Sequence, residues 1–291
     1  MTRRIAGLLL GPVLVAPIWA DSLTVGGLVD SEEGRSIDLS ARYSPARALT
    51  LGAQIGHSES QLEQGDKFSG TSIGASVGLD YDAFFADVSA DRWKDSGDLR
   101  STVVRGELGW LSLDGIALSA LVTHRDMRVT YTATVLGETR ERNIDFTGTG
   151  FGADLTYYGK VWTSGVRFLG YDYGRSVDRV RTVLTDTSTD RFPRVSDLVG
   201  SVATRAASAP DRELSFLVGR QFARMSRTSL IADLRWQRDA LTGDDTRGVG
   251  LTLSLTPRSH LGVDISGGAS KTDGAGTVGW AGVSFTLSRA K

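Results

Sequence analysis

Three histidines and their neighbours are the first residues to test for catalysis. His57, His124 and His260 are the side chains able to act as imidazole bases near neutral pH. His57 precedes Ser58 and Glu59, so a base, a nucleophile and an acid stand in one short run. Adjacent residues on a strand point to opposite faces, so Ser58 cannot pair directly with His57. The run is interpreted as a polar strand end, and we expect no enzyme activity.

Composition limits the remaining chemistry. The 291 residues include no cysteine, which excludes disulfides, thiolate metal sites and cysteine nucleophiles. Asp87 and Asp91 share one strand face but stand about 13 Å apart by the rise per residue, too far to share a proton. The glycines on either side of Val249 lack the helix and the lysine of a phosphate-binding loop. Basic and acidic residues number 33 and 34, and this balance indicates that the chain has no nucleic-acid partner. Because the ligand sets and motifs named above are missing, we also expect no metal and no cofactor.

A set of charged residues recurs at alternate positions and could line a water-filled space. Its acidic members outnumber the basic ones, which would weakly favour cations. The alternative is that they are solvated or mutually paired groups that stabilise a wall. The predicted pore-lining residues are Asp87, Asp91, Arg105, Glu107, Arg125, Asp154, Arg167, Asp233, Arg235 and Asp264, with Asp38, Asp80 and Arg42 as further members.

Strands must position these residues, because the chain alternates with period two from Leu23 onward. One face of each expected strand is apolar, and the other is small and polar with isolated charges. Fourteen strands are counted in this way. Their apolar faces span residues 23–25, 37–43, 49–55, 73–81, 84–90, 104–110, 116–122, 151–157, 162–168, 214–218, 230–236, 249–255, 261–265 and 281–287.

A soluble sandwich or a lipocalin-like barrel would show the same alternation, but three features favour a transmembrane barrel. Connections alternate between short and long, as periplasmic turns and outer loops do. Ten tilted residues span roughly 25 Å, the height of a lipid-facing band. Aromatic residues gather at strand ends, where interfacial belts are expected. The predicted belt residues are Tyr43, Tyr81, Trp93, Trp110, Tyr157, Trp162, Trp236 and Trp280.

The N-terminal segment has the layout of a secretory signal. Residues 1–20 contain two arginines, an apolar run and a small residue at Ala20, so we predict cleavage after Ala20. Residues 21–291 then form one domain, and the predicted location is the bacterial outer membrane. The segment Met127–Asn143 is expected to extend its hairpin beyond the membrane.

The last predicted strand carries a further signal. Gly282, Phe285 and Leu287 have the spacing of the C-terminal motif that outer-membrane barrels present to the barrel-assembly machinery. Over essentially all of residues 21–291, the chain resembles the Gram-negative outer-membrane β-barrel proteins, a porin-like class. The resemblance implies an all-β fold: a single antiparallel up-and-down transmembrane barrel of about 14 strands, with 12–16 allowed. It implies contact with outer-membrane lipid and lipopolysaccharide, and it carries no substrate with it.

A barrel of this size would be roughly 28 Å across between backbones and would hold water. Many of the 35 glycines fall on its predicted inner face, where they are interpreted as leaving space for that water. The leading hypothesis is therefore a porin-like channel for ions or small polar solutes. Residues 174–212 form a long outer loop that either folds inward and gates the pore or is a mobile surface connection. The alternative function is a structural or translocation barrel, resembling an autotransporter β-domain, that exports, anchors or assembles a separately encoded protein.

Overall fold

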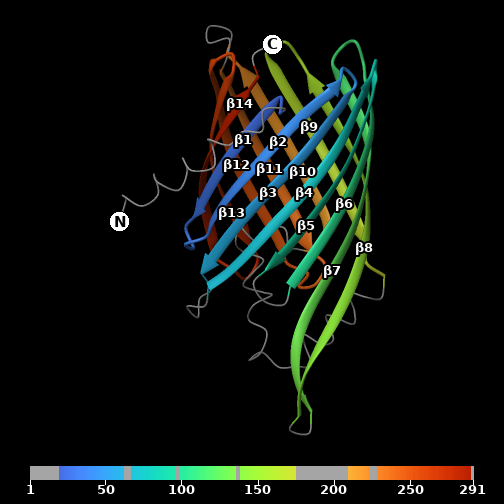
Figure 1. Ribbon diagram of the computed structural model, residues 1–291, viewed down its shortest axis with the longest axis vertical. Coiled ribbons are helices and arrows are strands. Elements are labelled where there is room, and N and C mark those ends of the chain that lie inside the picture. Colours follow the sequence, from blue (N-terminus) through green and yellow to red (C-terminus); the bar gives the residue numbers. More distant parts are fainter. Residues whose placement is uncertain are drawn as a thin grey trace.

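Fourteen antiparallel strands close on themselves into one barrel, as the alternation predicts (Figure 1). The computed structural model describes residues 20–61, 67–95, 99–135, 138–174, 209–222 and 228–289. Almost the whole predicted leader and most of the loop 174–212 lie outside these residues. The strands are β1 (Ser22–Asp30), β2 (Arg35–Ala46), β3 (Leu49–Gln61), β4 (Lys67–Tyr81), β5 (Phe84–Asp95), β6 (Leu99–Leu111), β7 (Ile116–Val135), β8 (Glu138–Tyr158), β9 (Trp162–Asp172), β10 (Pro210–Gln221), β11 (Thr228–Asp239), β12 (Asp245–Arg258), β13 (Leu261–Thr272) and β14 (Thr277–Ser288).

Each strand pairs with its neighbours in sequence, and β1 pairs with β14 to close the barrel. The closing register runs from Ser22 opposite Ser288 to Asp30 opposite Trp280. Closure leaves no strand edge with unpaired backbone groups, which is the condition for a sheet to cross lipid. No helix among the described residues is long and apolar enough to cross a membrane.

The two ends of the barrel differ. At one end, here called the short-turn end, short turns join the strands. Gly115 lies in one of these turns; its φ is 81°, and it approaches the carbonyl of Tyr158 so closely that no side chain would fit there. The other, the long-loop end, carries the longer connections. Strands β7 and β8 project past the rest of the barrel there, paired from Ile116–Tyr157 out to Val135–Glu138 (Figure 1). The predicted extension of this hairpin is confirmed.

Large apolar side chains cover the outside of the barrel rather than its interior. Ile73, Leu108 and Phe151 are each at least 60% exposed. The most deeply buried apolar side chains, including Phe146 and Met127 at 1% exposure, have the opposite parity on their strands and face inward. The wall is therefore apolar outward over its middle, whereas the buried side chains inside lie mainly toward the long-loop end, on strands that include β5, β6, β7 and β8.

Candidate functional site: the lumen of the barrel

Register and alternation define which side chains face the lumen. The charged residues have the opposite parity from the exposed apolar residues of the same strands. The structure places all ten predicted pore-lining residues on the lumen face, and all but one of them come from β5 to β11. They are Asp87, Asp91, Arg105, Glu107, Arg125, Asp154, Arg167, Asp233, Arg235 and Asp264.

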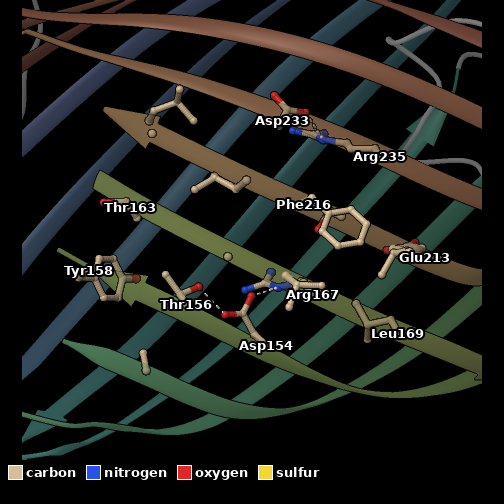
Figure 2. Close-up of a pocket in the computed structure, with 18 of the residues that line it drawn as sticks. Asp154, Thr156, Tyr158, Thr163, Arg167, Leu169, Glu213, Phe216, Asp233 and Arg235 are labelled. Carbon is tan, nitrogen blue, oxygen red and sulfur yellow. Dashed lines mark hydrogen bonds and ion pairs between the residues drawn. The ribbon is translucent and has the colours of Figure 1, made fainter. Parts of the chain in front are cut away.

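Ion pairs connect these charges across and along the strands. Arg105 Nη1 lies 2.9 Å from Asp91 Oδ2, joining β6 to β5. Arg235 Nε lies 2.8 Å from Asp233 Oδ2, two residues earlier on β11 (Figure 2). Each pair lies on the polar face of a half-exposed wall, so it contributes little to stability. Its chief effect is that neighbouring fixed charges cancel.

Arg167 on β9 is placed between two carboxylates. Its Nε donates a hydrogen bond of 2.9 Å to Asp154 Oδ2 (Figure 2). Its Nη2 lies 3.7 Å from Glu107 Oε2. Thr156 also donates to Asp154 at 2.8 Å, and Ser119 donates to Glu107 at 2.6 Å. Four strands, β6 to β9, thus hold one guanidinium in a fixed position on the lumen wall.

A cavity of about 1030 Å³ lies inside the barrel against this wall. Five arginines line it together with four carboxylates: Arg105, Arg125, Arg167 and Arg235 face the lumen, and Arg220 has the outward parity of β10. Three of the carboxylates, Glu107, Asp154 and Asp233, belong to the predicted set; the fourth, Glu213 on β10, does not. Figure 2 shows Glu213 on the strand between those that carry Arg167 and Arg235. Glu213 has the same parity as Ser215 and Leu217, so extending the β10 alternation by two residues would have identified it.

Other lumen carboxylates have no basic partner among the described residues. Asp38, Asp80 and Asp87 make no ion pair within 4 Å, and Asp264 accepts only a hydrogen bond of 3.3 Å from Ser284. Asp87 also stands directly opposite Glu107 in the β5–β6 register. Among the described residues, the lumen wall therefore carries more uncompensated negative than positive charge.

Two predicted belt residues face the lumen, which corrects their assignment. Trp93 is 4% exposed and shares the inward parity of Asp91. Trp280 is opposite Gly268 on the inner face of β13, and its ring would lie 2.7 Å from a Cβ added there. Both tryptophans stand near strand ends, as a belt requires, but residue parity and not distance from the loop decides which medium a side chain meets.

The inward rings also change the interpretation of several glycines. A Cβ at Gly109 would lie 2.1 Å from the ring of Phe85, directly opposite it, and one at Gly70 would lie 2.5 Å from Trp93. Aromatic rings fill the space beside these glycines, so the glycines do not leave space for water in the lumen. At such positions the small residue lets a large one on the neighbouring strand lie flat against the wall.

The other predicted belt residues share the parity of the exposed apolar side chains. They are Tyr43, Tyr81, Trp110, Tyr157 and Trp162 at the short-turn end and Trp236 at the long-loop end. Tyr81 is 74% exposed. Arg220 lies over the ring of Trp162 at 5.0 Å, a cation–π contact on the outer surface.

The histidines lie away from the lumen. His57 and Ser58 are on opposite faces of β3, as alternation predicts, with His57 near Glu59 and Thr71 at 3.4 Å each. His124 also faces outward and lies 3.3 Å from Thr149. In the described part of the chain, no three His, Asp or Glu side chains are grouped closely enough to hold a metal ion.

The residues of the C-terminal motif lie at the closing seam. Phe285 and Leu287 of β14 face outward opposite Val25 and Leu23 of β1, and Gly282 faces inward opposite Leu28. The seam is therefore apolar on the outside.

Comparison with known proteins finds likeness in fold alone. No family model matches the chain, and no curated protein does. Among solved structures, the CymD monoaromatic hydrocarbon channel aligns over 98% of this chain and 93% of its own, with a TM-score of 0.56 and 8% identity. The KdgM porin in complex with disordered oligogalacturonate aligns over 92% and 99%, with a TM-score of 0.42 and 10% identity. OccAB1 of Acinetobacter baumannii aligns over 91% and 94%, with a TM-score of 0.46 and 7% identity. This chain thus has the closed antiparallel barrel fold of outer-membrane porins and channels.

Proposed function

We propose that this protein is an outer-membrane channel that conducts ions and small polar solutes through its lumen. Support for the membrane setting comes from the outer surface. Side chains such as Ile73, Leu108 and Phe151 would expose a continuous apolar band to water, far beyond what soluble monomers show. Lipid is the medium that such a band fits.

One observation carries the channel itself: a cavity of about 1030 Å³ inside the barrel, lined by five arginines and four carboxylates. Displacement of water from these charges by an apolar solute is unfavourable, whereas ions and polar solutes interact with the charges favourably. The uncompensated carboxylates Asp38, Asp80, Asp87 and Asp264 on other parts of the wall favour cations over anions. The proposed channel is therefore weakly cation-selective.

The proposed orientation places the short-turn end in the periplasm and the long-loop end outside the cell. This follows the usual asymmetry of outer-membrane barrels. Export through a signal cleaved after Ala20 and insertion by the barrel-assembly machinery are part of the proposal. Gating by the loop 174–212 stays a prediction: if it gates the pore, deletion of residues 180–207 increases the conductance, and an unchanged conductance rejects gating.

Solute uptake by proteoliposomes tests the proposed function. Liposomes that contain the folded protein are expected to swell in isotonic solutions of small sugars or amino acids, faster for smaller solutes. The same amount of protein unfolded by boiling is the control, because it loses the lumen and keeps the composition. Swelling no faster than in protein-free liposomes, with the barrel still folded, would reject the channel.

A further inference from the structure

Three successive lumen-facing side chains of β10 combine three kinds of chemistry. Glu213, Ser215 and Leu217 alternate along the inner face of this strand, so neighbours in the series stand about 7 Å apart. All three line the cavity inside the barrel. They present a carboxylate, a hydroxyl and an apolar group in that order, and they are called the β10 row below.

Two guanidinium groups flank the middle of the β10 row. Ser215 is directly opposite Arg167 on β9 and Arg235 on β11, one on each side (Figure 2). These two strands are about 10 Å apart, so an anion bound over Ser215 is within reach of both arginine side chains. The arginine side chains are 45% and 57% exposed, whereas their partners Asp154 and Asp233 are 17% and 19% exposed. The guanidinium groups are therefore the accessible members of these pairs, and the position between them suits a carboxylate.

The carboxylate of Glu213 stands on one side of this position. It forms a hydrogen bond with Tyr171, and it makes no ion pair with a basic side chain in the described part of the chain. Arg105, Arg125 and Arg167 act on it through space. A simple cation at Glu213 would be repelled by these arginines, whereas an ammonium group that arrives with its own carboxylate compensates them.

An apolar surface lies on the other side of Ser215. Leu217 and Ile231 are both half-buried on the inner wall, on β10 and β11. Gly219 is directly opposite Ile231, and a Cβ added at Gly219 would lie 3.4 Å from Ile231 Cγ1. Because this glycine has no side chain, an apolar group from a solute can lie against Ile231 and Leu217 together.

We propose that the β10 row, with Arg167 and Arg235, binds zwitterionic α-amino acids that have an aliphatic side chain. The carboxylate of the amino acid lies over Ser215 between the two guanidinium groups. Its ammonium group contacts Glu213, and its side chain lies against Leu217 and Ile231. The inference rests on the proposed function, because it names a solute class for the same lumen.

The three kinds of contact distinguish this class from other small solutes. A sugar has no charge to offer either the guanidinium groups or Glu213. An organic anion matches the guanidinium groups but leaves Glu213 without a partner, and an amine does the reverse. A zwitterion carries no net charge, so the excess of negative charge on the lumen wall does not exclude it.

Saturation-transfer NMR with L-leucine and the purified full-length barrel in detergent tests the site without requiring conduction. Arg235→Gln and Glu213→Gln should each weaken leucine binding about fivefold, the effect of one unit charge at about 4 Å in water. Leu217→Ser should weaken it about fourfold, the effect of about one buried methylene group. Arg247→Gln is the matched control, because it removes a cation from the outward face opposite Trp236, and it should bind leucine like the wild type. Protein-free detergent provides the blank.

Wild-type protein with leucine analogues keeps the test independent of how the variants fold. The probes are 4-methylpentanoate, which lacks the ammonium group, 3-methylbutylamine, which lacks the carboxylate, and alanine, which lacks most of the side chain. Each should bind at least about fourfold more weakly than leucine. Equal or tighter binding of any of them would overturn the proposal, and so would unchanged leucine binding in Arg235→Gln or Glu213→Gln.

Conductance of the same preparations in planar bilayers separates this inference from the proposed function. Ionic steps from a barrel that does not bind leucine would overturn the amino-acid site alone. Leucine binding with the predicted variant effects, by a folded barrel that gives no steps, would support the site and reject the channel.

Discussion

Replacing Arg167 by glutamine should make the channel more selective for cations. Arg167 is the guanidinium that lies 2.9 Å from Asp154 and 3.7 Å from Glu107. Glutamine keeps a hydrogen-bond donor near Asp154 but removes one positive charge from the lumen wall. The two carboxylates then face passing ions without compensation.

The magnitude follows from Coulomb's law. An ion that passes about 10 Å from one unit charge in water changes its energy by about 0.4 kcal/mol. Loss of the Arg167 charge favours a cation and disfavours an anion by that amount, so their permeability ratio should change by about 0.8 kcal/mol, or roughly fourfold. Because the Debye length is about 10 Å at 0.1 M salt and about 3 Å at 1 M, the effect should largely vanish at 1 M.

Reversal potentials of single channels under a salt gradient near 0.1 M measure this ratio. Arg247→Gln is the control, because Arg247 faces outward opposite Trp236 and its loss leaves the lumen charge unchanged. A ratio that stays constant in Arg167→Gln would refute the assignment of Arg167 to the conducting path. A change of the same size at 1 M salt would refute the electrostatic explanation.

Two further substitutions test the packing of the wall. Gly109→Leu should destabilise the barrel by about 1–3 kcal/mol, because its side chain displaces the ring of Phe85; Gly279→Ala, where the nearest atom to a new Cβ is 3.9 Å away, should be neutral in the same urea titration. Asp239→Ala should cost about 1–3 kcal/mol, because the 3% exposed carboxylate accepts backbone N–H groups of Ala209, Leu241 and Thr242 at 2.8–3.3 Å. Equal urea midpoints for wild type and either destabilising variant would contradict these assignments.

The fold could be predicted from sequence because a barrel wall imposes one rule on every strand. Alternation with period two gave fourteen strands, and the same rule gave the face of each lumen residue. Which charges meet is a different matter. Arg167 lies beside Asp154 because the short connection between β8 and β9 sets their register, and residue types do not specify that register.

The errors at Trp93 and Trp280 have one cause. Both predictions rest on distance from a strand end, although the sequence also shows the parity that Trp93 shares with Asp91 and Trp280 with Gly282. Ring-on-glycine contacts such as Phe85 on Gly109 require the pairing of two particular strands, so composition alone cannot reveal them.

Single-channel recording from purified protein in planar lipid bilayers tests the central claim most directly. The sample must first be shown to be folded, by its altered electrophoretic mobility before and after boiling. We predict discrete ionic steps with weak cation selectivity, because ions are expected to cross the membrane through the charged lumen around Arg167. A folded, inserted barrel that gives no steps would contradict the account.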